Sequence, residues 1–160
     1  MLDVTELLPL IVLLAEREVD FVLIGGAAGV VQGSSYPTYD VDVAYARDRP
    51  NLERLAGALE SVGATLRGAP KDIPFILDAE TLGKGGNFTF DTKLGALDVL
   101  AYAEGSPSYE RLRDETRVIS LGGHDVRVAS LDHLIRMKEA AGRTKDKLMA
   151  TEYRILSDEG

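Results

Sequence analysis

A chain of 160 residues with 45% hydrophobic and 28% charged side chains is expected to form one globular domain over residues 1–160. The absence of cysteine excludes disulfides, thiolate metal sites and cysteine nucleophiles, and two isolated histidines argue against a zinc site, so any metal ligands must be carboxylates. A formal net charge of −8 disfavours non-specific binding to nucleic acid, although a local basic patch would still allow RNA to bind.

The first predicted element is an amphipathic helix over residues 4–18. Asp3 and Glu6 have the spacing of an N-terminal capping box, whereas Pro9 weakens the prediction. The apolar run 7–15 is too short to span a bilayer, and its flanks are acidic where a signal peptide would be basic. We therefore predict a soluble, cytoplasmic protein with no membrane partner. The apolar positions with helical spacing are Leu7, Leu10, Ile11 and Leu14.

A strand, a glycine turn and a short helix come next. A buried strand is predicted at residues 21–24, and it stops at Gly25 and Gly26. A short helix then covers residues 27–32, and after a loop a second strand covers residues 38–45, which are rich in β-branched and aromatic side chains.

The rest of the chain continues to alternate helices and strands, except for an irregular stretch over 63–86 that contains a candidate short strand at 73–77. The two strands nearest the C-terminus should form a hairpin, because they flank a pair of glycines. The predicted helices are 51–62, 130–141 with Ser130 as its cap, and 144–156, and the predicted strands are 87–92, 94–101, 116–120 and 124–129.

The second strand carries two aspartates on one face. Side chains alternate along a strand, so Asp40 and Asp42 point the same way, with their Cα atoms roughly 7 Å apart. The opposite face, with Tyr39, Val41 and Val43, is expected to be the core. The two carboxylates could bind one or two hard cations such as Mg²⁺ or Mn²⁺, or they could simply be solvated acids on a half-exposed strand.

The glycine pair strengthens the metal hypothesis. Gly25 and Gly26 lie where a strand becomes a helix, a place where backbone N–H groups can bind phosphate and missing side chains let its oxygens approach. Glycine pairs also make ordinary turns. Together, however, the turn and the acidic strand predict a phosphate site beside a metal site.

A third carboxylate, Asp98, interrupts an apolar run. Leu97, Val99 and Leu100 surround it, so burial is expected, and a buried carboxylate is costly without a cation. It could be a third metal ligand or an aspartate exposed at a strand end.

Basic residues near the C-terminus are candidate phosphate contacts. Lys138 follows Leu131, Leu134 and Ile135 on the apolar stripe of its predicted helix, so its ammonium either reaches the acidic cluster or extends to solvent at the edge of the core. Arg143 and Lys145 in the following turn could contact phosphate or acceptor, or be ordinary surface charge. No role is assigned to His124 and His133, which are interpreted as surface polar residues. Ser34 and Ser35 could donate hydrogen bonds to a phosphate, although a turn is sufficient to explain them.

Two stretches of the chain resemble a known signature. Residues 21–28 and 38–43 are similar to the Gly-Gly and T-x-D-h-D motifs of the DNA polymerase β-type nucleotidyltransferase superfamily, and the spacing of eleven residues between Gly26 and Thr38 fits that signature. Within that superfamily, the chain resembles small bacterial proteins grouped with the AbiEii and MenT-type toxins.

Later segments extend the resemblance over residues 21–146. The segments that carry this further resemblance are residues 94–100 and 128–138. Family members often have histidine where this chain has Gln32 and a charged residue where it has Tyr39, but neither position is a metal ligand.

The resemblance implies an α/β (α+β) nucleotidyltransferase fold with a mixed β-sheet flanked by helices. It also implies Mg²⁺ held by Asp40 and Asp42, an NTP whose phosphates contact Gly25, Gly26 and Thr38, and Asp98 as the base that deprotonates an acceptor hydroxyl.

The acceptor itself is not encoded in the motif. A toxin-like enzyme would modify an RNA end such as that of tRNA and could have an antitoxin partner, whereas an antibiotic-type enzyme would modify a small molecule, which an acidic chain tolerates better. A third alternative is an inactive nucleotide-binding or interaction module, although all three aspartates are present.

Overall fold

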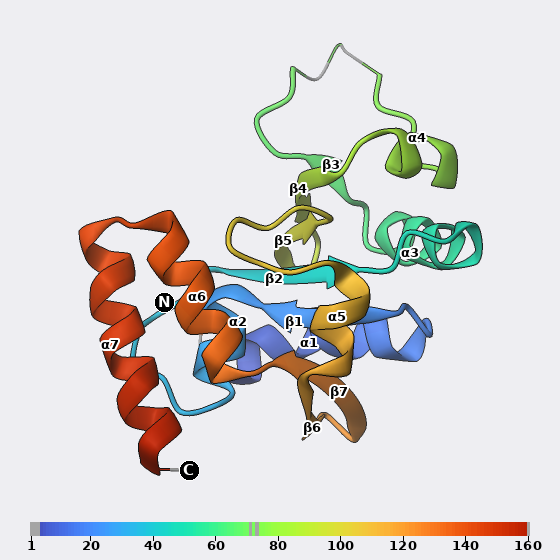
Figure 1. Ribbon diagram of the computed structural model, residues 1–160. Coiled ribbons are helices and arrows are strands. Elements are labelled where there is room, and N and C mark those ends of the chain that lie inside the picture. Colours follow the sequence, from blue (N-terminus) through green and yellow to red (C-terminus); the bar gives the residue numbers. More distant parts are fainter. Residues whose placement is uncertain (1–3, 71, 73, 160) are drawn as a thin grey trace.

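The structure is a computed structural model that describes residues 4–70, 72 and 74–159. Seven strands form one mixed sheet in the order β3-β4-β5-β2-β1-β7-β6, with helices around it (Figure 1). The strands are β1 (Phe21–Ile24), β2 (Asp40–Tyr45), β3 (Thr65–Leu66), β4 (Asn87–Thr92), β5 (Gly95–Leu100), β6 (Thr116–Leu121) and β7 (His124–Ala129). The helices are α1 (Val4–Glu16), α2 (Gly25–Val30), α3 (Arg49–Ser61), α4 (Ala79–Lys84), α5 (Tyr109–Asp114), α6 (Leu131–Ala141) and α7 (Thr144–Glu159).

The centre of the sheet is formed by β5, β2 and β1. All four residues of β1 are buried, which explains its uninterrupted apolar sequence. It pairs with β2 in antiparallel register, with Ile24 opposite Asp42. On its other edge, β2 runs parallel to β5, with Asp42 opposite Asp98. The register thus brings the acidic residues of two strands to the same level of the sheet.

Helices complete the core and fix the ends of the strands. The predicted apolar face of α1 is buried, and this helix contacts β7, β2 and α3. Helices α6 and α7 pack against each other as a hairpin at one end of the molecule, beside α2 (Figure 1). Gly142 ends α6 in the left-handed conformation at φ 70°, as its position predicts. No helix in the described ranges is long and apolar enough to cross a membrane.

Some local predictions were wrong. The second strand begins at Asp40, and Tyr39 lies in a bend with 64% of its surface exposed, so it is not part of the core. Residues 74–77 form no strand, and Ile73 lies outside the described residues, as does the predicted cap Asp3. The short helix begins at Gly25 instead of residue 27. The sequence analysis missed β3, α4 and α5, which are two to six residues long and too short to show a period.

Candidate active site

Three aspartates meet on one face of the central strands. Asp40 and Asp42 alternate along β2, and Asp98 lies opposite Asp42 on β5. One carboxylate oxygen from each lies within 4.8 Å of the other two. This spacing allows all three side chains to contact the same divalent cation or pair of cations.

The electrostatics of the triad favour a bound cation. Burial, followed by the charges of Asp40 and Asp98, raises the pKa of Asp42 to about 8. Burial and the neighbouring Asp98 also raise the pKa of Asp40. The Oδ1 atom of Asp42 is buried without a hydrogen-bond partner. An oxygen-preferring ion such as Mg²⁺ fits this all-carboxylate set, because it would satisfy that atom and offset the repulsion among the three acids.

The two glycines are needed for close packing around the triad. A Cβ atom added to Gly25 would lie closer than 3.0 Å to the Oδ2 atom of Asp42, and Gly25 also has φ 67°. A Cβ atom on Gly26 would come equally close to the hydroxyl of Thr38. The residue before α2, Ile24, forms no side-chain cap. The turn therefore presents uncapped backbone N–H groups next to the acidic cluster.

Thr38 is buried, and its hydroxyl donates a hydrogen bond to the carbonyl of Asp40 at 3.1 Å. This bond fixes the chain just before β2. The loop that precedes Thr38 is attached to α7, because Glu152 of that helix accepts hydrogen bonds from Ser34 and Ser35. The two serines thus have a structural role in the turn, and neither lines the cleft described next.

A cleft of about 430 Å³ opens beside the triad. It brings together the predicted site residues except Gly25, which contacts Asp42 from the turn, and Asp98 on the neighbouring strand. Its remaining walls come from the bend before β2 and from α7. The lining residues are Gly26, Pro37, Thr38, Tyr39, Asp40, Asp42, Lys138, Arg143, Lys145, Asp146 and Met149.

Asp146 organises the basic side of this cleft. Only 1% of its surface is exposed, and it accepts bonds from Arg143 Nε at 2.7 Å and from Lys138 Nζ at 3.4 Å. Hydrogen bonding to Arg143 lowers the pKa of Asp146. The positive charge of Lys138 also acts on Asp42 and favours its ionised form. Asp146 was not singled out from the sequence, and the structure shows that it is buried and bonded to both cations.

Arg67 is a second residue that the sequence analysis missed. Its Nη2 atom lies 3.0 Å from Asp98 Oδ1, and its Nε lies 3.2 Å from Asp91 Oδ1. The same Nη2 donates to the carbonyl of Phe90 at 2.9 Å. Arg67 follows the two-residue strand β3 in the stretch that was predicted as irregular, so no periodic signal placed it near Asp98.

Both histidines lie outside the cleft. The surface prediction was wrong for His133, which is 2% exposed and has Nε2 2.9 Å from a carboxylate oxygen of Glu115.

No protein-family model matches this sequence, and no curated protein sequence matches it significantly. Solved structures do match. The lincosamide antibiotic adenylyltransferase LnuA, solved with lincomycin bound, superposes with a TM-score of 0.64 at 14% identity, covering 95% of this chain and 96% of LnuA. The chain has the nucleotidyltransferase fold.

Two further structures with the nucleotidyltransferase fold agree. The antibiotic-resistance factor ANT(2'')-Ia matches with a TM-score of 0.59 and 16% identity over 98% of this chain and 84% of that one. An antigenic nucleotidyltransferase-like protein from Paracoccidioides brasiliensis matches with a TM-score of 0.56 and 17% identity over 96% of this chain and 74% of its own. The predicted fold class, a mixed sheet flanked by helices, is confirmed.

The acidic triad is consistent with the divalent-metal site of the nucleotidyltransferase fold. The closer resemblance to AbiEii and MenT-type toxins finds no support among these matches, and the roles of the individual site residues stay predictions.

Proposed function

We propose that this chain is a Mg²⁺-dependent nucleotidyltransferase that moves a nucleoside monophosphate from an NTP to a hydroxyl group of a small molecule. The observation that carries the proposal is the triad, with the buried, unpartnered oxygen of Asp42, beside a cleft lined by Lys138 and Arg143. A site for a metal-nucleotide complex needs carboxylates to bind the metal ion and basic side chains to bind the polyphosphate.

In the proposed site, Asp40, Asp42 and Asp98 bind Mg²⁺, with Mn²⁺ as a substitute. When bound there, the metal would polarise the α-phosphate and offset the negative charge that develops during transfer. The N–H groups of Gly25 and Gly26 and the hydroxyl of Thr38 orient the phosphates. Lys138, Arg143 and Lys145 contribute positive charge along the opposite wall of the cleft.

The transfer balances without a redox partner. The acceptor hydroxyl oxygen forms a bond to the α-phosphorus, the bond from that phosphorus to the bridging oxygen breaks, and pyrophosphate leaves with the electron pair. The hydroxyl proton passes to the carboxylate of Asp98, whose Oδ1 accepts a hydrogen bond from Arg67.

The small-molecule acceptor is favoured by charge and by structural similarity. With a formal net charge of −8, the surface as a whole repels a long polyanion. LnuA is an adenylyltransferase of lincosamide antibiotics, and ANT(2'')-Ia has been solved with adenylyl-2''-tobramycin. No observation on this chain favours tRNA or an antitoxin partner, so tRNA enters only as a comparison in the test.

The test is incubation of the purified chain with Mg²⁺ and each α-labelled NTP, together with tobramycin, lincomycin or total tRNA. We expect label on a small molecule, loss of label with Asp42→Asn or a chelator, and full activity with Asp125→Asn, a substitution of an exposed aspartate on β7. Label on tRNA alone would overturn the small-molecule acceptor. Absence of transfer to any acceptor, together with absence of NTP binding by calorimetry, would overturn the enzyme.

A further inference from the structure

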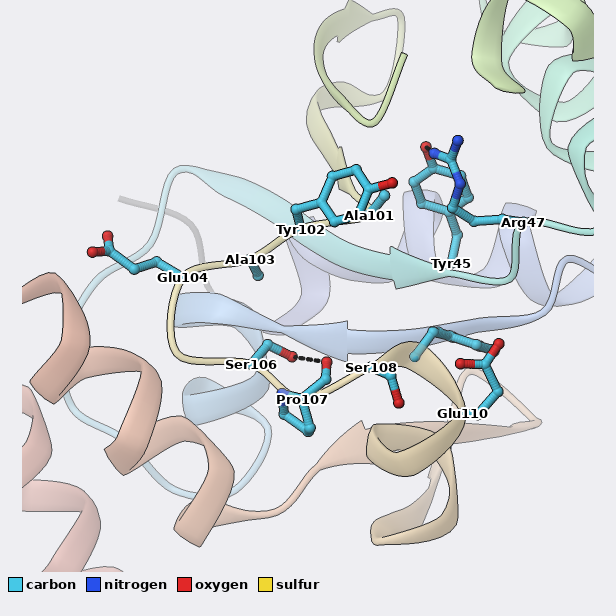
Figure 2. A pocket seen from close by; sticks show the side chains of 11 residues that line it. Tyr45, Arg47, Ala101, Tyr102, Ala103, Glu104, Ser106, Pro107, Ser108 and Glu110 are labelled. Atoms are coloured by element: carbon cyan, nitrogen blue, oxygen red, sulfur yellow. Dashed lines mark hydrogen bonds between the residues drawn. The ribbon is translucent and has the colours of Figure 1, made fainter. Parts of the chain in front are cut away.

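A second cleft, of about 570 Å³, lies beyond the triad along β2 and β5 (Figure 2). Its floor is the end of these strands, with Tyr45, Arg47 and Tyr102, and its other wall is the loop that joins β5 to α5. This loop runs back across the sheet before it enters α5, as Figure 2 shows. Neither the sequence motifs nor the triad accounts for this cleft.

Tyr102 forms a fixed aromatic surface in this cleft. Although 71% of its surface is exposed, its backbone exchanges two hydrogen bonds with the side chain of Asn87, each 3.0 Å long. A Cβ atom at Gly86 would lie closer than 3.0 Å to the Tyr102 ring, so only glycine lets the ring lie this near the chain. An exposed aromatic ring held from two sides is preorganised for contact with a ligand.

Arg47 supports this surface through contacts with both tyrosines. Its guanidinium carbon lies 5.8 Å from the ring centroids of both Tyr45 and Tyr102. Its Nη1 donates to the hydroxyl of Tyr45 at 3.0 Å, and its Nη2 donates to the carbonyl of Gly83 at 2.8 Å. These contacts orient the guanidinium, and its single positive charge is present in the cleft with the carboxylates described next.

The remaining charges in the cleft are two carboxylates. Glu104 and Glu110 line it, both are exposed, and neither forms a salt bridge within the described part of the chain. Figure 2 shows Glu104 and Glu110 at opposite ends, with Tyr102 between them. Such a cleft would bind a cationic molecule whose ring packs on the tyrosine and whose ammonium and hydroxyl groups donate to the carboxylates.

The position of the cleft relates it to the triad. Tyr102 follows Asp98 by four residues in the direction of β5, which corresponds to roughly 13 Å between Cα atoms. Hydrogen bonding to Asp146 is the main cause that raises the pKa of Arg143, on the rim of the first cleft, and the charge of Glu104 adds a smaller contribution from the second cleft. Gly105 packs closely against Arg136 and Ala140 of α6, which fixes the loop in this position. A molecule of two or three rings could thus bind in the second cleft and extend a hydroxyl toward the triad.

We propose that the cleft between Tyr102, Glu104 and Glu110 is the acceptor subsite and that it selects a small, hydroxylated and positively charged molecule. This inference rests on the proposed nucleotidyltransferase function. It assigns the acceptor to residues outside the metal and phosphate sites and predicts the sign of the acceptor's charge.

The test is calorimetric binding of tobramycin, which carries several ammonium and hydroxyl groups, to the full chain with Mg²⁺ and a non-hydrolysable ATP analogue. Sucrose serves as an uncharged hydroxylated probe. Glu104→Gln, Glu110→Gln and Tyr102→Ala are compared with Glu60→Gln, a control at an exposed acid on α3 outside this cleft. We expect each of the first three substitutions to weaken tobramycin binding about tenfold, which corresponds to the loss of about one charge-assisted bond or aromatic contact. Their affinity for the ATP analogue should not change, and Glu60→Gln should bind tobramycin as the unmodified chain does.

Three outcomes would overturn the subsite while leaving the proposed function intact. They are unchanged tobramycin affinity in the three variants, equal binding of sucrose, or absence of tobramycin binding while the ATP analogue binds. Loss of affinity for the ATP analogue in Tyr102→Ala would instead assign this cleft to the nucleotide and would also overturn the subsite. Failure of the unmodified chain to bind Mg²⁺ and the ATP analogue would contradict the proposed function itself.

Discussion

Asp42 is the carboxylate whose surroundings most oppose a free negative charge. Its pKa of about 8 in the folded chain lies above the ordinary value of 3.8, because it is buried beside Asp40 and Asp98. The folded state therefore holds a proton that the unfolded state releases, and the stability that this proton provides is lost as the pH rises from about 4 through about 8. The metal-free protein should become less stable over this range.

The first prediction is that Asp42→Asn stabilises the metal-free chain. In a chelator at pH 8 we expect a gain on the order of 2 kcal/mol in the free energy of unfolding. The gain should shrink toward zero as the pH falls below 3.8, where the carboxyl of Asp42 is protonated in both the folded and the unfolded state. Thermal unfolding at several pH values measures this difference. Asp125→Asn should change nothing at any pH, and a loss of stability in Asp42→Asn at pH 8 would contradict the account.

Arg67 provides a second prediction for a single residue. Because its guanidinium holds Asp98 at 3.0 Å, we expect Arg67→Met to lower kcat about tenfold, with a smaller effect on the KM for NTP. Arg67→Lys should recover part of kcat, since it keeps the charge but not the second bond to Asp91. Arg49→Met, which breaks an exposed pair with Glu53, is the control. Equal losses in the two methionine variants would show that Arg67 only stabilises the fold.

Among the elements, the junction of β1 and α2 determines whether the triad can form. We expect Gly25→Ala to destabilise the chain by about 1–3 kcal/mol, because φ 67° strains alanine and its Cβ would displace Asp42. Chemical denaturation measures the loss. Gly57→Ala, within α3 and with no atom within 4 Å of the added Cβ, should be neutral or slightly stabilising. Equal stability of the two variants would remove the argument for close packing at Gly25.

The elements that the sequence predicted well are those with a strong local pattern. The apolar run of β1, the alternation of β2 and the capped, periodic helix α6 were all found from neighbouring residues. The short elements β3, α4 and α5 were missed, and the residues that follow β3 or join β5 to α5 were missed with them. Arg67, Tyr102 and Glu104 belong to those segments, and only the folded chain shows what they contact.

Across the whole molecule, the site depends on contacts that link distant parts of the sequence. Local spacing predicted that Asp40 and Asp42 share a face, but only the parallel pairing of β2 with β5 places Asp98 beside them. The same holds for the cations, because Asp146 of α7 brings Lys138 and Arg143 to the cleft through a buried contact. The family resemblance predicted which residues would meet, and their partners became visible only in three dimensions.

The charged residues that we propose bind the phosphates and the acceptor in the two clefts differ in sign. The chain has a formal net charge of −8, and the basic residues Lys138, Arg143 and Lys145, which we propose contact the phosphates, line the cleft beside Asp40 and Asp42. The acidic residues Glu104 and Glu110 lie in the other cleft. Polyphosphate and a cationic acceptor would thus be attracted to different parts of one surface.

The most direct test of the proposed metal site is a titration with Mn²⁺ in the presence of a non-hydrolysable ATP analogue, in which binding is measured by electron paramagnetic resonance. We expect binding to the unmodified chain and to Asp125→Asn, and at least tenfold weaker binding to Asp42→Asn, because asparagine replaces the carboxylate with its buried, unpartnered oxygen by a neutral amide. Equal Mn²⁺ affinity in the unmodified chain and Asp42→Asn would contradict the assignment of the triad as the metal site.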